Sequence, residues 1–301
     1  MDVDPVTGNI DPGLISEAVH DLVDGGSHAE RWVPGNLSAS RLGRGKAILP
    51  VDVFGQPADM DAIVEIAYHH GLVVIEDSCA AIGSEHKGRK AGSLGDVGVF
   101  AFYPNKQMTT GEGGMLVADR DDWDALFRSL RNQGRDVFGA WLNHTRLGYN
   151  YRLDEMSAGL GLAQLKRLEE LMARRARVAH WYNKRLSPRE LIETPTIVPE
   201  TTRMSWFVYV VRIKAPASRD RAIAELKARG IASRPYFAPI HLQPFHREGF
   251  GYRQGDYPVA EKLGAMSLAL PFSSVMTEAQ VDHVCEELIA MVQRTQRGRS
   301  E

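Results

Sequence analysis

Two side chains of opposite charge stand just beyond apolar runs of the sequence. The run 97–102 leads through Tyr-Pro-Asn to Lys106, and the run 72–75 leads through one glutamate to Asp77. Parallel strands of an open α/β sheet end at one edge, and such sheets bind ligands there. We therefore expect the two side chains to lie at the same edge. They suit pyridoxal phosphate, because the amine can form a Schiff base with its aldehyde and the carboxylate can keep its ring nitrogen protonated.

The segment after Lys106 is rich in glycine. Residues 107–114 read Gln-Met-Thr-Thr-Gly-Glu-Gly-Gly, and a second apolar run follows at 115–118. Glycine permits positive φ angles and a close approach of the backbone to a ligand. This context favours a cofactor-binding lysine over a solvated surface charge. Asp77 taken alone is equally compatible with a helix N-cap or a turn.

The stretch that would hold these residues alternates between strand and helix patterns. Residues 47–53 read as a strand, Asp59 can cap a following helix, and Gly71 stands where that helix should stop. The run 72–75 is continuously apolar, as in parallel strands that are buried on both faces. This alternation predicts a doubly wound α/β layer.

The second half of the chain has a different pattern. Residues 153–186 carry leucines at helical spacing and predict one long helix. The sequence then predicts a strand at 206–213, a helix at 220–229 and a final amphipathic helix at 278–293. Helices and strands in this order indicate a smaller α+β unit.

Length and composition fit a protein of two domains. A chain of 301 residues can hold one large and one small domain, which we predict at 1–175 and 176–301. Its 36 Lys and Arg nearly balance its 38 Asp and Glu, so neither nucleic acid nor an anionic membrane is indicated as a partner. Cys79 and Cys285 form no disulfide framework and no metal-binding spacing. No apolar run approaches the roughly 20 residues of a membrane span, and the N-terminus does not resemble a signal peptide, so we predict a cytoplasmic protein.

Several segments together resemble a known family. Glu-Asp at 76–77, Phe-Tyr-Pro-Asn-Lys at 102–106 and Gly-Glu-Gly-Gly at 111–114 have the order and spacing of the DegT/DnrJ/EryC1/StrS family of sugar aminotransferases. The similarity runs from residue 2 to the region of residue 292. It implies the α/β fold of type I aminotransferases, in which helices sandwich a mostly parallel sheet and a smaller α+β domain follows.

The same resemblance implies roles for single residues. Pyridoxal phosphate would be the cofactor, with Lys106 as the Schiff-base residue and Asp77 beside the ring nitrogen. Cys79 would pack against the ring, which is compatible with its simpler interpretation as a small buried hydrophobe. Asn150, within Gly-Tyr-Asn-Tyr-Arg at 148–152, matches an asparagine that reaches the cofactor phosphate of the neighbouring subunit. This implies a homodimer with shared active sites, whereas the alternative makes Asn150 a loop residue at a helix start.

Segment 233–241 is similar to the border of the family's nucleotide-sugar site. Its candidate substrate residues are Arg234, Tyr236 and His241. Arg234 could bind diphosphate oxygens through two parallel hydrogen bonds, and the aromatic rings could face the sugar or the base. The alternative is a rigid loop punctuated by proline, in which His241 makes a structural hydrogen bond. The sequence leaves both open.

The function implied by the resemblance is transamination of a keto sugar linked to a nucleoside diphosphate, with glutamate as amino donor, in amino-sugar and polysaccharide biosynthesis. The sugar 3-dehydratases of the same superfamily carry histidine in place of the lysine, so Lys106 argues against that reaction. The alternative is a catalytically silent homologue or partner subunit that binds the cofactor weakly or not at all.

Three departures from the family pattern bear on that alternative. Ala101 stands where the family has a phosphate-binding serine, and Ala80 stands where it has a glutamine that contacts the phenolic oxygen of the cofactor. The family's first segment, about 80 residues that include a phosphate-binding helix start, precedes the point where this sequence begins. A late start site, a deliberately shortened chain and a real truncation would each explain this.

Overall fold

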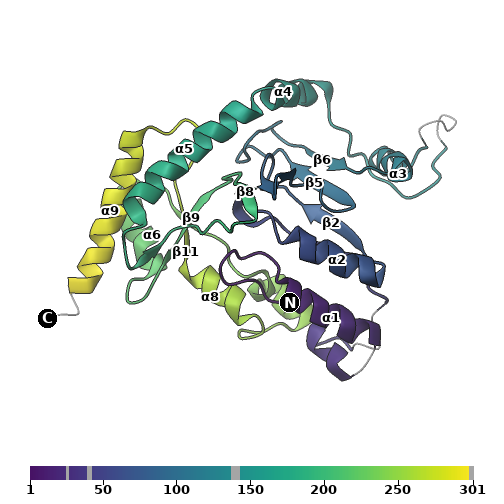
Figure 1. Cartoon of the computed structure of the whole chain (residues 1–301), viewed down its shortest axis with the longest axis horizontal. Helices are drawn as coiled ribbons and strands as arrows, with labels where there is room; N and C mark the ends of the chain where they lie inside the picture. The colour runs from purple at the N-terminus through teal and green to yellow at the C-terminus, as the bar shows by residue number, and fades with distance from the viewer. Residues whose placement is uncertain (25–26, 39–42, 137–142, 298–301) are drawn as a thin grey trace.

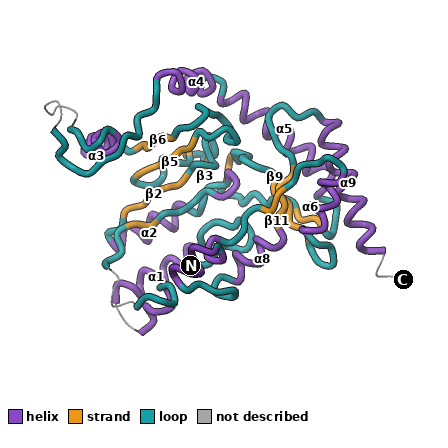
Figure 2. Tube along the Cα trace, turned by 180° about the vertical axis from the view of Figure 1, so that it is seen from behind, coloured by secondary structure: helices purple, strands orange, loops and turns teal. Residues whose placement is uncertain are grey.

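The computed structural model of the chain describes residues 1–24, 27–38, 43–136 and 143–297. Two four-stranded β-sheets lie side by side, and a long helix extends from the neighbourhood of the first to the second (Figure 1). Tube and ribbon views agree on this arrangement (Figure 2). A third, three-stranded sheet has the strand order β4 (Arg89–Lys90), β3 (Glu85–His86), β8 (Thr201–Arg203). None of the described helices is long and apolar enough to cross a membrane.

The α-helices of the described residues are α1 (Pro12–Asp24), α2 (Met60–His70), α3 (Asp121–Arg131), α4 (Glu155–Leu165), α5 (Leu168–Leu186), α6 (Arg219–Ala228), α7 (Pro244–Phe250), α8 (Pro258–Met266) and α9 (Glu278–Arg297). The strands are β1 (Ala47–Ile48), β2 (Val73–Asp77), β3 (Glu85–His86), β4 (Arg89–Lys90), β5 (Val97–Ala101), β6 (Gly114–Val117), β7 (Ile192–Glu193), β8 (Thr201–Arg203), β9 (Tyr209–Ile213), β10 (Arg234–Pro235) and β11 (Ser267–Leu270). Short 3₁₀-helices are η1 (Ser27–Trp32), η3 (Val53–Gly55) and η4 (Ile240–Leu242).

The first sheet has the strand order β1-β2-β5-β6 and contains the two strands, β2 and β5, that lead to Asp77 and Lys106. β1, β2 and β5 are parallel, whereas β6 returns antiparallel to β5. The predicted caps of α2 are confirmed, because the Asp59 carboxylate accepts from the Ala62 N–H and Gly71 ends the helix with φ 63°. This alternation of helix and strand confirms the predicted α/β fold class.

Gly98 lets the turn before β5 pack directly on that strand. A Cβ atom built on Gly98 would lie 1.9 Å from the carbonyl oxygen of Gly92, a distance no side chain can occupy. The glycine therefore permits the close approach of two backbone segments. This contact helps to hold the strand that leads to Lys106.

The second sheet is antiparallel, in the order β10-β11-β9-β7, and packs against α5, α6 and α9. Its central strand β9 contributes Tyr209, whose ring stacks on Tyr182 of α5 at 4.6 Å between centroids. Both rings are fully buried within the larger apolar core. A core of this size fixes the end of α5 firmly against the second sheet.

The structure corrects several predicted element boundaries. The helix predicted at 153–186 is broken at Lys166 and Arg167 into α4 and α5. The strand predicted at 47–53 shrinks to β1 and an isolated bridge between Val51 and Asp77, and η3 begins at Val53. The predicted domain boundary at residue 175 falls within α5, and the division into two domains remains a prediction.

Candidate active site

The carboxyl ends of β2 and β5 place the predicted residues together. Asp77, the last residue of β2, is aligned with Val99 of β5. The backbone of Asp77 is tied on its other side to the segment after β1, because its N–H donates to the Pro50 carbonyl at 2.9 Å. The chain leaves β5 through residues 102–105 and reaches Lys106 at the same edge. The expectation from the sequence that an amine and a carboxylate share this edge matches the geometry.

Lys106 lies half-buried at the mouth of this edge. Its backbone N–H donates to the Tyr103 carbonyl at 2.9 Å, which closes a turn. Its amine lies 4.2 Å from the ring centroid of Phe207, in a cation–π contact. Burial lowers the pKa of the Lys106 amine, and the neighbouring Cys79 and Asp77 offset only part of that effect. A lowered pKa makes the unprotonated, nucleophilic form of the amine more available.

Cys79 is a neighbour of both the amine and the carboxylate. Its backbone N–H donates to Asp77 Oδ1 at 3.1 Å, and its sulfur lies 3.8 Å from the Val99 carbonyl oxygen. Burial and the adjacent Asp77 raise the pKa of the Cys79 thiol to about 12. The thiol is therefore protonated at neutral pH and is a packing group, not a nucleophile.

Two residues near Asp77, Asp52 and Ser78, were not singled out from the sequence. The buried carboxylate of Asp52 accepts from the Ser78 hydroxyl at 2.6 Å and from the Ala58 N–H at 2.9 Å. Burial and the nearby Glu76 raise the pKa of the Asp52 carboxyl to about 7. Asp52 and Ser78 are 26 positions apart, so no local pattern in the sequence relates them.

Gln107, immediately after Lys106, joins three segments. Its buried amide donates to the Ala80 carbonyl at 2.7 Å and to the Ser205 hydroxyl at 2.5 Å. Ser205 in turn donates to the Ile82 carbonyl at 2.7 Å. Gln107 stands within the glycine-rich segment noted in the sequence, but its partners lie 27 and 98 positions away and could not be found from spacing.

The residues present fit the ring end of pyridoxal phosphate. A half-buried amine with a lowered pKa and a nearby carboxylate are the two groups that the ring chemistry uses, and the neighbouring Cys79 thiol is protonated. The two departures read from the sequence persist in the structure, since the methyl groups of Ala80 and Ala101 donate no hydrogen bond. The described residues therefore fit the ring and the aldehyde carbon of the cofactor rather than its phosphate.

Asn150 lies apart from the strand ends, beside the end of α3. It forms an isolated antiparallel bridge with Asn132, and its side chain is exposed. The helix after it is capped by Asp154, whose carboxylate accepts from the Ser157 N–H at 2.9 Å. Asn150 is thus not the cap of α4, and its predicted reach to a neighbouring subunit remains a prediction.

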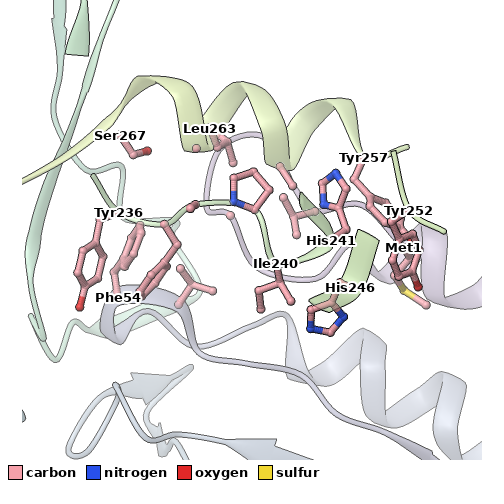
Figure 3. Close-up of a pocket in the computed structure, with 18 of the residues that line it drawn as sticks. Met1, Phe54, Tyr236, Ile240, His241, His246, Tyr252, Tyr257, Leu263 and Ser267 are labelled. Atoms are coloured by element: carbon pink, nitrogen blue, oxygen red, sulfur yellow. The ribbon is translucent and has the colours of Figure 1, made fainter. Parts of the chain in front are cut away.

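A pocket of about 450 Å³ lies between the N-terminal segment, η3 and the 236–241 loop. Phe54 and Tyr236 form one end, and His241, Tyr252 and Tyr257 form the other (Figure 3). The first end adjoins the lysine site, because the Tyr236 ring lies 6.4 Å from the ring of Phe207. The pocket therefore begins near Phe207, whose ring contacts the Lys106 amine, and extends away from it.

The three predicted substrate residues differ in their surroundings. Tyr236 lines the pocket near Lys106, as described above. His241 lines the far end, but its Nε2 is engaged by the Glu261 carboxylate at 2.9 Å and its ring is buried. Arg234 in β10 is exposed and is paired through its backbone with Ala269 of β11. Only Tyr236 is thus close to the lysine, and the substrate roles remain predictions.

Comparison with known proteins identifies relatives along nearly the whole chain. The model of the DegT/DnrJ/EryC1/StrS aminotransferase family matches residues 1–289. GDP-perosamine synthase of Caulobacter vibrioides is 41% identical over 260 residues, which are 84% of this chain and 69% of the relative. UDP-N-acetyl-3-dehydro-α-D-glucosamine 3-aminotransferase of Acidithiobacillus ferrooxidans is 36% identical, over 87% of this chain and 68% of the relative. This chain spans 64% to 70% of the length of the curated relatives that it matches at this level of similarity.

The fold is shared with solved structures of the same family. The crystal structure of a DegT DnrJ EryC1 StrS aminotransferase from Brucella abortus matches with a TM-score of 0.82 and 30% sequence identity, over 96% of this chain and 72% of the other. The family match and the shared fold agree with the placement of a lysine and an acid at neighbouring strand ends. The chain belongs to the DegT/DnrJ/EryC1/StrS aminotransferase family, whose cofactor is pyridoxal phosphate.

Proposed function

We propose that this protein transfers an amino group to a keto sugar carried on a nucleoside diphosphate, with glutamate as the amino donor. The observation that carries the proposal is the placement of Lys106 and Asp77 at adjacent strand ends, with the protonated Cys79 as a neighbour of both. The names of two relatives support the substrate class, because both describe products or substrates linked to a nucleoside diphosphate.

The bound cofactor would supply an electron sink for the carbanion that forms when the donor amino acid loses a proton. Lys106 would bind the cofactor through its amine and, once displaced, would move the proton to and from the reacting carbon. The lowered pKa of that amine suits this task, because a base works best when its pKa approaches the working pH. Asp77 would hold a proton on the ring nitrogen through its negative charge.

The pocket beyond Phe207 is the proposed site of the sugar nucleotide. Tyr236 adjoins the ring beneath Lys106, so we assign the sugar to this end of the pocket. The far end is lined by Tyr252 and Tyr257, whose rings can stack on a nucleobase. Arg234 would then bind the diphosphate from the neighbouring strand. His241 would keep the far wall in place through its bond with Glu261 rather than contact substrate directly.

We also propose a homodimer in which Asn150 completes the partner's cofactor site. Asn150 is exposed, as this role requires, and the same part of the chain exposes apolar side chains. Tyr151 is 72% exposed, Met156 on α4 is 87% exposed and Leu162 is 61% exposed. Exposed apolar surface of this kind is typical of sites where another protein binds. A phosphate contact from the partner would offset the hydroxyl that Ala101 lacks.

Spectroscopy tests the cofactor role directly. The purified chain with saturating pyridoxal phosphate is expected to gain a visible absorbance band, and borohydride reduction followed by peptide mapping should place the cofactor on Lys106. Lys106→Ala should abolish the band. Lys87→Ala is the matched control, because Lys87 is an exposed lysine paired with Asp61 and should leave the band intact. A wild-type chain that shows no band would overturn the enzyme proposal in favour of a silent homologue.

A substrate panel tests the second half of the proposal. Keto sugars linked to GDP, UDP or dTDP, supplied with glutamate, should yield amino sugars detected by mass spectrometry. Tyr252→Leu should raise KM for the preferred sugar nucleotide by about 3- to 10-fold, the value of one aromatic stacking contact. Tyr68→Leu, a change at an exposed tyrosine of α2, should leave KM unchanged. Equal effects of both changes would place the nucleotide elsewhere.

A further inference from the structure

Arg175 is a buried cation whose charge is not balanced by a carboxylate in the described part of the chain. It lies in α5, is 6% exposed, and burial lowers the pKa of its guanidinium to about 10. The neighbouring arginines of α5 behave differently, since Arg174 pairs with Glu170 and Arg185 pairs with Asp282. A buried charge is costly unless polar groups satisfy it, so the partners of Arg175 are informative.

Those partners are backbone carbonyl oxygens from two distant segments. Nη1 donates to the carbonyl of Trp206 at 3.1 Å and to that of Phe207 at 3.2 Å. Nη2 donates to the carbonyl of Lys106 at 3.4 Å. One rigid guanidinium thus binds the connection between β5 and β6 of the first sheet and the segment that enters β9 of the second.

The side chains of the residues held in this way meet each other. The Lys106 amine lies 4.2 Å from the Phe207 ring centroid, while the carbonyls of both residues are bound by the same guanidinium. The Arg175 side chain lies at a distance of 5.5 Å from the Phe272 ring, which leaves it little freedom to shift. Residues 102–113, which connect β5 to β6, form the Lys106 loop. Any movement of this loop away from Phe207 would therefore break a hydrogen bond to a buried cation.

We propose that Arg175 is a positioning residue for Lys106, which clamps the backbones of Lys106 and Phe207 together so that the amine stays over the ring. Held there, the amine is partly shielded from water. This desolvation is the largest influence on its pKa and disfavours the charged form, although the ring face itself attracts a cation. Released from the clamp, it would turn toward solvent and become an ordinary surface lysine. The value of this arrangement for catalysis rests on the proposed function of Lys106, whereas the clamp itself is a property of the chain without cofactor.

Competitive labelling tests the clamp in the full chain without added cofactor. Trace acetic anhydride, with Lys106 labelling followed by mass spectrometry across a pH series, reports the pKa of that amine. Arg175→Met should shift the midpoint upward by about half a unit or more, which is roughly a 3-fold smaller unprotonated fraction at a given pH below the midpoint. Arg175→Lys keeps the positive charge and most of the packing but replaces the planar fork of donors with a single ammonium nitrogen, so it should shift the midpoint in the same direction by less.

Arg203→Met is the matched control. Arg203 also ties α5 to the segment before Phe207, through Glu169, but it makes no contact with Lys106 among the described residues. Its loss should leave the midpoint unchanged. Equal shifts for Arg203→Met and Arg175→Met, or no shift in a folded Arg175 variant, would overturn the proposal. If Arg175→Met does not fold, the midpoint of Arg175→Lys decides alone. A wild-type chain that fails to bind pyridoxal phosphate would refute the proposed function, yet the labelling result would still stand.

Discussion

Two regions adjoin the Lys106 loop, and they differ in how completely their side chains are partnered. On one side lies the junction of the two sheets, where Gln107 binds Ala80 and Ser205 and where Arg175 binds three carbonyls. These polar side chains are buried and each makes at least two hydrogen bonds within the chain, although Gln107 Oε1 and Arg175 Nε have no hydrogen-bond partner among the described residues. The junction thus holds the loop from several directions.

The other region is the apolar face formed by β6, α4 and residues 147–151. It is attached to the same loop, because the Gln164 side chain of α4 both accepts from and donates to the backbone of Thr109. All of β6 is exposed, including Met115 and Leu116, and α4 exposes Leu162. In Figures 1 and 2, β6 and α4 lie on the same side of the molecule.

The difference bears on which parts of the site one chain provides. The amine, the carboxylate and the positioning of both depend on contacts within the chain. The apolar face has the composition of an interior but is exposed, which is typical of surfaces where another protein binds. The proposed phosphate ligand Asn150 belongs to this face. The comparison therefore predicts that the ring end of the cofactor site is built by one subunit and the phosphate end by two.

The largest expected effect comes from placing a charge on the apolar face. Leu162→Glu should convert a dimer to a monomer in analytical ultracentrifugation, because an unpaired charge buried in an interface is strongly destabilising. Cofactor affinity should fall with it if Asn150 acts across the interface. Val275→Glu, at an exposed apolar residue elsewhere, should leave the dimer intact. A wild-type chain that is already monomeric would refute the dimer, and a dimeric Leu162→Glu variant would place the interface on another face.

The next largest effect is expected at the ring end of the site. Asp77→Asn keeps an acceptor for the Cys79 N–H but removes the charge, so the fold should persist. Loss of a preorganised charge at a reacting group typically costs about 100- to 1000-fold in rate, and we expect that loss in the single-turnover rate of amino transfer. Asp96→Asn is the control, since Asp96 accepts from the Val74 N–H at the opposite end of the same strands. A rate unaffected by Asp77→Asn would remove this residue from the mechanism.

Part of this site could be predicted from the sequence because its signals are local. The apolar runs that precede Asp77 and Lys106 define strands, and parallel strands end at a common edge. The cap at Asp59 and the stop at Gly71 are likewise readable within one helix length. These features depend on neighbours in the chain, so the pattern alone locates them.

The remainder depends on tertiary contacts that leave no periodic signal. Arg175 appears in the sequence as one of several arginines on a helix, and only its burial against carbonyls 31 and 69 positions away distinguishes it. The leucine pattern of the sequence does not indicate the break between α4 and α5, for a related reason. The leucine spacing continues through Lys166, but α4 packs on the Lys106 loop whereas α5 packs on the second sheet. Helical periodicity does not report such a change of partner.

A smaller, pH-dependent effect on folding stability is expected at Asp52. The folded protein raises the pKa of Asp52 from 3.8 to about 7, so the fold prefers the protonated carboxyl, and its stability falls as pH rises through that window. Glu76 and Asp77, the charged neighbours, add to the cost of ionisation. Asp52→Asn imitates the protonated form and should remove up to about 4 kcal/mol of this pH dependence over the whole window, of which about 3 kcal/mol falls between pH 5 and pH 8.

Urea unfolding of wild type and Asp52→Asn at about pH 5 and about pH 8 measures this effect, because linkage acts on the difference between the two conditions. The variant should be the more stable protein at the higher pH and close to wild type at the lower. Glu65→Gln, on α2, provides a comparison for general charge removal. A variant with the same pH dependence as wild type would show that Asp52 does not titrate in this range.

The smallest effect is expected at the junction itself. Ser205→Ala removes the hydroxyl that accepts from Gln107 and donates to the Ile82 carbonyl, so it leaves both groups buried with one partner fewer. The loss should be about 1 to 3 kcal/mol of unfolding free energy. Ser93→Ala removes a bond of similar length, to the Lys90 carbonyl, but at an exposed site where water can replace it, so it should cost less than about 0.5 kcal/mol. Equal costs at the two serines would show that the junction is no more closed to water than the surface, and the contrast with the apolar face would then lose its basis.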